Sequence, residues 1–311
     1  MINALKKSFL ILLKIFVTIL VLLFLYEKIS EDKAGFASAF QLFSDNLFIL
    51  ILVIFLMPIN WLMEVLKWKI SVQPITQISF SNAIVGVLAG IALGFVTPHA
   101  VGDYFAKVFS LNHQNRKKAL GLILISRMMQ MLPTIIFGSV SFYIFSSRNI
   151  AKLDLPLSIS YPILSFLGLV LLILLVILFL KRNHPKIQDY VIPVQNMGLK
   201  IISLLAGLSM LRYLIFSAQF LLLLSVLGLK INIFLQFMGV AFMFLAKSIL
   251  PTFNFLSDLG IREFSVGLFF ESMNVEVAPI IASGLILWLI NIAFPAFIGL
   301  FFIPKLKLKS A

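Results

Sequence analysis

The stretch VAPIIASGLILWLINIAFPAFIGLFFIP, residues 277–304, contains no charged side chain. A helix needs about 20 consecutive apolar residues to cross the hydrocarbon core of a bilayer, and this stretch exceeds that length. Residues 128–147 form another uncharged stretch of sufficient length. The sequence therefore predicts membrane-spanning helices, because lipid offers no hydrogen-bond partners to the backbone of an open strand or loop.

Composition extends this prediction to the whole chain. Of the 311 residues, 61% are hydrophobic, and the mean hydropathy is +1.10. Soluble domains contain roughly 45–50% apolar residues. The short alternating segments of a membrane β-barrel are absent from the sequence. We predict an all-α polytopic protein of the cytoplasmic membrane, with residues 1–311 forming a single integral membrane domain.

The charged residues exclude several classes of function. The formal net charge is +13, but Lys and Arg lie in short loops at the ends of apolar runs, which is typical of membrane topology rather than nucleic-acid binding. The chain has no cysteine and three scattered histidines, which argues against thiolate or His-rich metal sites. Walker-type phosphate loops, HExxH and G-x-S-x-G motifs are missing. We expect no cofactor, no metal and no catalytic residue.

The distribution of basic loops determines the expected topology. Apolar segments occur at 9–26, 46–66, 82–110, 117–146, 160–181, 199–228, 232–250 with 259–272, and 277–303. If the N-terminus is cytoplasmic and each segment crosses once, the most basic internal loops, at 116–118 and 181–200, lie outside. This contradicts the excess of Lys and Arg that cytoplasmic loops carry.

Two re-entrant segments remove the contradiction. We expect 82–110 to enter from the cytoplasm, break at Pro98 and Gly102, and return to the same side. We expect 232–272 to do the same from outside, breaking near Pro251 to Gly260. Both basic loops and both termini are then cytoplasmic, with about six transmembrane helices and two re-entrant broken helices. Broken backbone at membrane depth needs protein or water around it, so both should lie centrally.

The same segments suggest an internal duplication. Helix 9–26 corresponds to 160–181, 46–66 to 199–228, 117–146 to 277–303, and the two breaks correspond to each other. The offset is roughly 150–160 residues, and a long-period match of this kind indicates a repeat. Each half, 1–150 and 155–303, crosses an odd number of times, so the sequence predicts an inverted repeat, an architecture of transporters.

Charged side chains within the apolar segments are candidates for substrate binding, because a charge at membrane depth is costly unless it faces a cavity or a partner. Asp103 with Lys107, and Asp258 with Arg262, are spaced to pair across one helical turn. The arginine fork suits phosphate or carboxylate. The alternative is a structural ion-pair network. The candidate substrate-binding residues are Asp103, Lys107, Arg127, Arg212, Lys247, Asp258, Arg262 and Glu263.

Other patterns predict structural roles. Gly86, Gly90 and Gly94 would form a ridge for close helix approach. Ser257 or Asp258 is expected to cap a helix. The mixture of aromatic and basic residues at 61–69, which includes Trp61, Lys67, Trp68 and Lys69, is typical of an interfacial anchor.

Two motifs resemble a known family. TPHAVGDYFAK at 97–107, together with LPT at 250–252 and LGIRE at 259–263, is similar to the paired motifs of the flippase-like family named for the membrane part of lysylphosphatidylglycerol synthases. The resemblance spans roughly residues 10–303. The chain departs from the family pattern at Lys107, where arginine is commoner, and at His99-Ala100, which is usually more polar. The resemblance implies the membrane module without the soluble aminoacyltransferase domain.

We therefore expect a lipid-binding or lipid-translocating module that recognises a polar or anionic headgroup in a central cavity, with membrane lipids as partners. One alternative is a membrane enzyme that transfers a group to or from a lipid-linked substrate. Another is a scaffold for a second membrane protein. The sequence leaves homo-oligomerisation open.

Overall fold

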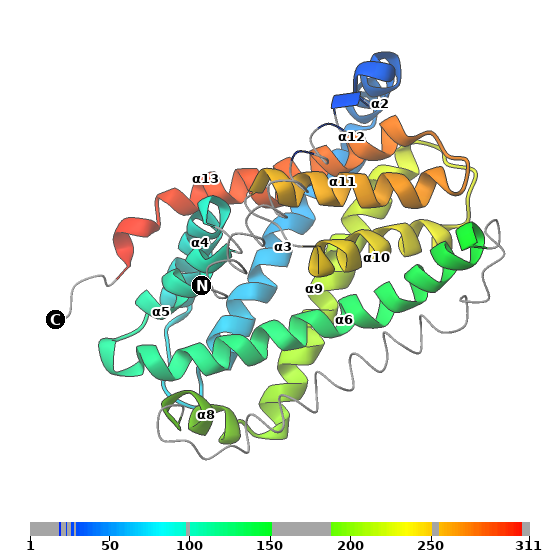
Figure 1. Cartoon of the computed structure of the whole chain (residues 1–311). Coiled ribbons are helices and arrows are strands. Elements are labelled where there is room, and N and C mark those ends of the chain that lie inside the picture. The colour runs from blue at the N-terminus through cyan, green and yellow to red at the C-terminus, as the bar shows by residue number, and fades with distance from the viewer. Residues whose placement is uncertain are drawn as a thin grey trace, which may run out of the picture.

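The computed structural model describes residues 19, 23, 26, 27, 29–97, 100–150, 188–250 and 255–306, except the side chains of 149, 150 and 255–258. Within these ranges every regular element is helical (Figure 1). The elements are α2 (Lys33–Asp45), α3 (Leu47–Ser71), α4 (Phe80–Val96), α5 (Val101–Phe109), η2 (His113–Asn115), α6 (Arg116–Ile150), α8 (Gln188–Gln195), α9 (Leu199–Val226), α10 (Ile233–Ile249), α11 (Phe255–Glu271), α12 (Val277–Trp288), η4 (Leu289–Ala293), α13 (Phe294–Leu300) and η5 (Ile303–Lys305).

Four helical stretches of the described part are long and apolar enough to cross a bilayer: Leu47–Ser71, His113–Arg148, Leu199–Val226 and Val277–Leu300. They coincide with four of the predicted segments. Helices α4 and α10 are apolar but shorter, at 17 residues each. The chain is thus a multi-pass membrane protein. The predicted helix at 160–181 lies outside the described residues, as does the helix at 9–26 apart from single positions.

Helices α4 and α5 form an antiparallel hairpin. Helix α4 ends at Val96, and Ala100 has a left-handed φ of 52° before α5 begins at Val101. The expected interruption of the helix is present between Val96 and Val101; residues 98 and 99 lie outside the description, and Gly102, the second residue expected to break the helix, lies inside α5. The nearest neighbours of the three glycines show the antiparallel direction: Gly86 lies against Ser110, Gly90 against Asp103, and Gly94 against Ala100. Residue numbers thus increase along α4 while those of the contacted residues decrease. The predicted glycine ridge is therefore confirmed as a packing surface.

Helices α10 and α11 form a second antiparallel hairpin. Asn232 caps α10 by accepting a hydrogen bond from the Phe234 backbone N–H at 2.7 Å. A Cβ at Gly239, early in α10, would lie 2.6 Å from the ring of Phe270 near the end of α11. The predicted second break lies before residue 255, where α11 begins.

The prediction of a helix cap at Ser257 or Asp258 is wrong. Because α11 already begins at Phe255, both residues lie inside the helix. Gly260, which was expected to mark the end of the break, is also helical. The predicted Asp258–Arg262 pair involves a side chain outside the description.

The hairpins pack against the long helices in a reciprocal pattern. Helix α4 packs on α13, α10 packs on α6, and α3 packs on α9. Glycines allow the close approach of α4 to α13 and of α10 to α6. A Cβ at Gly299 of α13 would lie 2.1 Å from the carbonyl oxygen of Leu88, and a Cβ at Gly138 of α6 would lie 2.7 Å from Leu245 Cβ.

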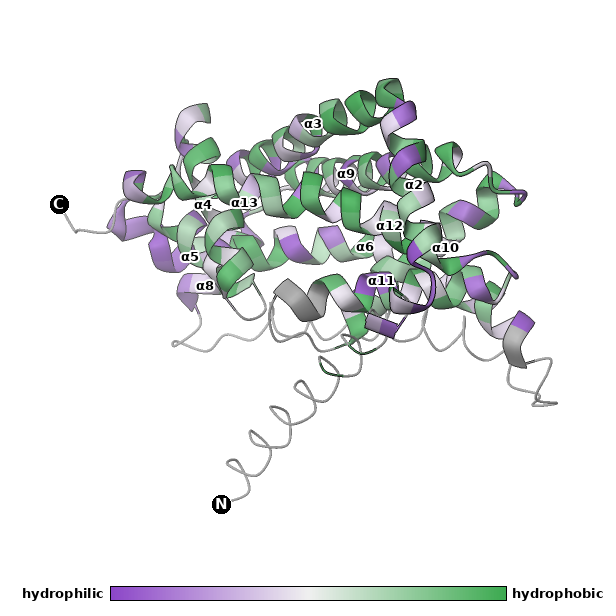
Figure 2. Ribbon diagram, turned by 90° about the horizontal axis from the view of Figure 1, so that it is seen from above, coloured by the Kyte–Doolittle hydropathy of each residue, from purple (hydrophilic) through white to green (hydrophobic). Residues whose placement is uncertain are grey.

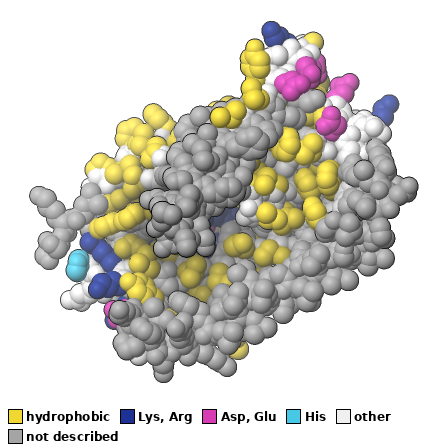
Figure 3. All heavy atoms as spheres, viewed as in Figure 1, with side chains coloured by type: hydrophobic (Ala, Val, Ile, Leu, Met, Phe, Trp, Pro, Cys, Tyr) yellow, Lys and Arg dark blue, Asp and Glu magenta, His cyan; other side chains and the backbone are white. Residues whose placement is uncertain are grey.

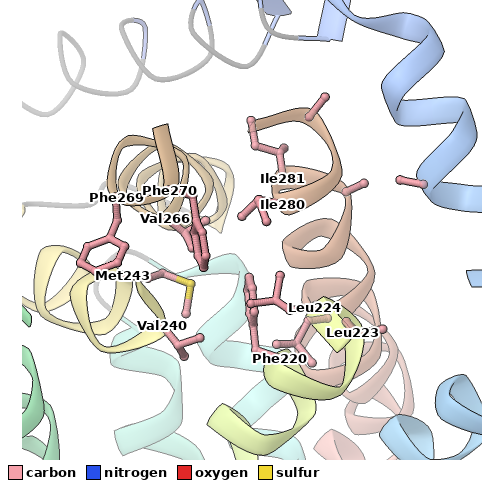
Figure 4. Close-up of a cluster of buried hydrophobic side chains, with 14 of the residues drawn as sticks. Phe220, Leu223, Leu224, Val240, Met243, Val266, Phe269, Phe270, Ile280 and Ile281 are labelled. Atoms are coloured by element: carbon pink, nitrogen blue, oxygen red, sulfur yellow. The ribbon is translucent and has the colours of Figure 1, made fainter. Parts of the chain in front are cut away.

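The largest buried apolar cluster holds the α10–α11 hairpin against α9 and α12 (Figure 4). Its labelled members are Phe220, Leu223 and Leu224 of α9, Val240 and Met243 of α10, Val266, Phe269 and Phe270 of α11, and Ile280 and Ile281 of α12. Lipid tails are as apolar as these side chains, so the stabilisation comes from close van der Waals packing.

Hydrophobic residues dominate the helices through the middle of the molecule, and hydrophilic residues are more frequent at its two ends (Figure 2). Helix α2 and the turn between α11 and α12 lie at one end, and α8, the turn between α5 and α6 and η5 lie at the other (Figure 1). Asp and Glu side chains gather near α2, and several Lys and Arg side chains lie at the opposite end (Figure 3). Glu31, Asp32, Glu271 and Glu276 line a cleft of about 420 Å³ at the acidic end.

Candidate functional site

Glu64 is the centre of a buried ion network. It lies on α3 with 7% of its surface exposed. Lys67 Nζ lies 3.4 Å from Oε2, and Lys107 Nζ lies 2.6 Å from Oε1. Arg212 Nη1 also donates to Oε2. One carboxylate therefore links α3, α5 and α9.

Asp103 is the second carboxylate of the network. It lies in the first turn of α5, where the positive end of the helix dipole favours a negative charge. Lys107, one turn later, donates to Oδ2 at 3.0 Å, and Arg127 from α6 donates to the same oxygen. The predicted pair of Asp103 and Lys107 is confirmed. Arg127 thus forms an ion pair with Asp103, as the alternative of a structural network expects.

Both lysines of the network are buried and donate to other side chains. Lys67 is 1% exposed, and its Nζ lies 2.6 Å from the amide oxygen of Gln130 on α6 as well as near Glu64. Lys107 is 3% exposed and connects the two carboxylates. These ammonium groups already have oxygen partners, so they hold the network together.

The predicted interfacial anchor is wrong for Lys67 and Trp68. Trp68 is 2% exposed. Its ring packs in a buried cluster with Val87 of α4 and Val108 of α5. The α4–α5 hairpin covers this part of α3, so its aromatic and basic side chains face the protein interior.

The two arginines are the more accessible members of the network. The side chains of Arg127 and Arg212 are 36% and 28% exposed, whereas that of Lys107 is 4% exposed. Arg212 Nε donates to Asn60 Oδ1 at 2.8 Å, and the Arg127 guanidinium carbon lies 5.4 Å from the ring centroid of Tyr104. A guanidinium has five N–H donors. These contacts leave some unused, and Arg127 Nε is buried without a hydrogen-bond partner.

The network carries more positive than negative charge. Among the residues that the structure describes, its four cations, Lys67, Lys107, Arg127 and Arg212, face two carboxylates, which leaves an excess of two positive charges. An uncompensated charge inside a membrane protein costs about 2.5–3.5 kcal/mol even on the lenient insertion scale. The arrangement therefore favours an additional anion beside the arginines.

The remaining predicted residues lie on the second hairpin. Arg262 and Glu263 are 1% and 0% exposed on α11. The Arg262 guanidinium carbon lies 5.1 Å from the ring centroid of Phe216 on α9. Lys247 lies in the last turn of α10, and the side chain of Asp258 is outside the description. The structure thus joins Asp103, Lys107, Arg127 and Arg212 in one network, while Arg262 takes no part in its ion pairs.

Sequence reasoning missed four members of the network. Glu64, Lys67, Asn60 and Gln130 were not among the candidate residues. For Glu64 a signal existed, because a carboxylate inside the apolar segment 46–66 needs a buried partner as much as Asp103 does. The neutral amides Asn60 and Gln130 give no such signal, since only the packing of α3 against α6 and α9 reveals their partners.

Comparison with known families gives one match. The family model described as lysylphosphatidylglycerol synthase TM region matches residues 11–299, nearly the whole chain. No curated protein and no solved structure matches the chain.

Proposed function

The chain belongs to the lysylphosphatidylglycerol synthase TM region family, and from this premise we propose that it binds or translocates membrane lipids through an anionic headgroup. Arg127 and Arg212 are the residues that would contact the headgroup. The observation that carries this proposal is the excess of two positive charges in a network whose arginines keep unused donors.

The chemistry of the two arginines favours a phosphate group. A guanidinium presents parallel N–H donors that match two oxygens of a phosphate. In the network both arginines pair with a carboxylate through one edge, Arg127 with Asp103 and Arg212 with Glu64. These pairs fix the orientation of the guanidinium groups while spare donors remain for a ligand.

The difference between arginines and lysines also supports a binding role. A ligand can reach only those cations that the surrounding helices leave accessible. Here Lys67 and Lys107 are buried, whereas the arginine side chains are about one-third exposed. We assign the lysines to the scaffold and the arginines to the ligand.

The packing of the hairpins supports a re-entrant, inverted-repeat topology as part of the same proposal. Helix α5 has nine residues, about 14 Å in length, which is too short for a hydrocarbon core of about 30 Å. The contacts of α4 with α13 and of α10 with α6 are equivalent if the halves are related by duplication. Each hairpin then packs on the final helix of the other half.

The distribution of charge supports cytoplasmic termini in this topology. The first turn of α6 carries Arg116, Lys117 and Lys118, and η5 at the same end carries Lys305. The opposite end has the acidic cleft. Because short cytoplasmic loops are enriched in Lys and Arg, we place the α5–α6 end in the cytoplasm.

Lipid retention by the purified protein tests the function. Native mass spectrometry of gently solubilised protein should detect a bound anionic phospholipid. Arg127→Gln and Arg212→Gln should each reduce retention about tenfold, the equivalent of one charged hydrogen bond. Neither change strands a buried carboxylate, since Asp103 keeps Lys107 and Glu64 keeps two lysines.

Arg148→Gln is the matched control, because Arg148 is an exposed arginine near the other end of α6. Retention by this variant should equal that of the wild type. Equal retention by all variants would contradict the proposed site. Consumption of an activated donor by the purified protein would instead favour a membrane enzyme.

A further inference from the structure

Arg262 is buried without a hydrogen-bonding partner for two of its nitrogens. It is 1% exposed, and among the residues that the structure describes its Nε and Nη2 atoms donate to no acceptor. Its guanidinium carbon lies over the face of Phe216, 5.1 Å from the ring centroid. A buried charge normally has both a partner and hydrogen bonds, because removing it from water is costly. The structure retains this cation with donors unused.

The adjacent carboxylate does not face Arg262. Glu263 is directed to α12, where a Cβ at Gly284 would lie 1.9 Å from its Oε2 atom. Arg262 is directed to α9 through Phe216. Consecutive residues on a helix do not share a face, so the two charged groups approach different neighbouring helices.

Arg262 of α11 contacts α9 one helical turn away from Arg212, which belongs to the ion network. Phe216 follows Arg212 by four residues, and residues at this spacing are neighbours on a helix surface, about 6 Å apart along the axis. Arg212 pairs with Glu64, whereas Phe216 contacts Arg262. Arg212 on α9 and the Phe216 ring that Arg262 contacts therefore occupy successive turns of α9.

A second unused donor lies in the same region. The hydroxyl of Tyr213 is buried without a hydrogen-bond partner. Its ring and that of Phe216 both contact Phe244 of α10, with centroids 4.9 Å and 5.1 Å away. The phenol and the guanidinium thus belong to one aromatic cluster, in which Arg262 lies over Phe216, Tyr213 contacts Phe244, and the rings of Phe216 and Phe244 contact each other.

We propose that Arg262 is a second anion-binding residue, which receives the phosphate group after Arg127 and Arg212 and thereby provides a step across the bundle. The inference rests on the proposed function. The ligand class is a phosphate, supplied either by a lipid headgroup or by a free phosphate ion. Tyr213 would add a neutral hydrogen bond at this position. In the wild type, the spare N–H groups of Arg262 would donate hydrogen bonds to the oxygen atoms of the arriving phosphate.

The test compares Arg262→Gln and Arg262→Lys with Arg116→Gln. Arg116 is the matched control, because its guanidinium also lies over a phenylalanine, 4.5 Å from the ring centroid of Phe109, but at the basic end of the molecule. Each protein is reconstituted in phosphatidylcholine vesicles that contain acyl-labelled phosphatidylglycerol. Transfer between leaflets is measured by chemical quenching of the label in the outer leaflet. Lipid retention is measured in parallel by native mass spectrometry.

We expect Arg262→Gln to slow transfer about tenfold, the loss of one charged hydrogen bond, while retention at the first site stays at the wild-type level. Arg262→Lys keeps the charge without the fork and should give an intermediate rate. If Arg262→Gln fails to fold, the transfer rate of Arg262→Lys alone tests the inference. Transfer rates for the tested Arg262 variants equal to that of Arg116→Gln would overturn the inference.

Thermal shifts distinguish the two sources of phosphate. Phosphatidylglycerol and, separately, inorganic phosphate are added to the detergent-solubilised protein, because a ligand that binds the folded state raises Tm. If the rise in Tm is smaller for Arg262→Lys than for Arg116→Gln when phosphatidylglycerol is added but not when phosphate is added, the ligand is a lipid headgroup. If the rise is smaller with each of the two ligands, the site recognises phosphate itself. Identical shifts in the two variants overturn the second site. If the wild type neither retains nor moves lipid, the proposed function itself fails.

Discussion

Asp103 on α5 lies directly against Gly90 on α4, so closely that a Cβ at position 90 would come within 2.5 Å of the carboxylate oxygen Oδ1. The other oxygen, Oδ2, accepts from Lys107 and Arg127. The glycine therefore provides the space in which this buried carboxylate meets its two cations. Packing of the hairpin and formation of the ion network depend on the same position.

Gly90→Ala should disrupt both properties. The new methyl group would force Asp103 away from its cations or separate α4 from α5, and overpacking of this kind costs about 1–3 kcal/mol. We expect a lower Tm and weaker lipid retention. Gly94→Ala is the control on the same helix, since its Cβ would meet Ala100 at an ordinary 3.4 Å. That variant should match or exceed wild-type stability, because alanine favours helix by about 1 kcal/mol. Equal stability of the two variants would contradict the assigned role of Gly90.

Glu64→Gln should destabilise the protein strongly. The carboxylate balances Lys67, Lys107 and Arg212, and removing one partner of a buried ionic group costs about 3–5 kcal/mol. Arg212→Gln alone should be milder, because Glu64 keeps both lysines. In the double variant, loss of the arginine relieves part of the charge excess created by Glu64→Gln. Equilibrium unfolding of the four proteins should therefore show a coupling energy of about 0.5–3 kcal/mol. Strict additivity would mean that the two side chains act independently.

Single cysteines should report the re-entrant topology. The chain has no native cysteine, so each introduced thiol gives an unambiguous signal. Gln77 precedes α4 and Lys117 follows α5, and both side chains are exposed. If the α4–α5 hairpin enters and leaves on one side, Gln77→Cys and Lys117→Cys will both react from the cytoplasm with a membrane-impermeant maleimide. Labelling of these two positions from opposite sides would show that the hairpin crosses the membrane.

The second hairpin provides the complementary measurement. Lys230 precedes α10 and Glu276 follows α11, and both are exposed. Lys230→Cys and Glu276→Cys should react from outside, because Lys230 and Glu276 flank the hairpin that enters from that side. Cytoplasmic labelling of either position would contradict the inverted orientation of the two halves.

The long helices and the hairpin breaks were predictable, whereas the partners in the ion network were not. Bilayer thickness sets the length of a spanning helix, so the uncharged runs at 128–147 and 277–304 identify two of the crossings almost by themselves. The first hairpin follows from the proline and glycine at 98 and 102, which interrupt an apolar run. Helices α2 and α8 were not predicted, because their segments are short and contain polar residues.

The ion network depends on which helices become neighbours, and a single sequence gives little information on this. Asp103 and Lys107 share one helix, so their spacing predicts the pair. Arg212 and Glu64 belong to α9 and α3, far apart in the chain, and only the tertiary packing brings them together. Lys67 was wrongly assigned to an interfacial anchor. Its segment combines aromatic and basic residues, and this composition is the same whether the segment lies at the lipid interface or is covered by the α4–α5 hairpin.

Gly299→Ala and Gly138→Ala test the reciprocal packing that the proposed duplication requires. The first places a Cβ 2.1 Å from the carbonyl oxygen of Leu88, and the second places one 2.7 Å from Leu245 Cβ. Both contacts join a hairpin to the last long helix of the other half, so both variants should lose about 1–3 kcal/mol of stability. Gly207→Ala is the control, because open space surrounds that position on α9. If thermal unfolding shows that Gly299→Ala and Gly138→Ala are as stable as Gly207→Ala, close contact at these positions is not what holds the halves together.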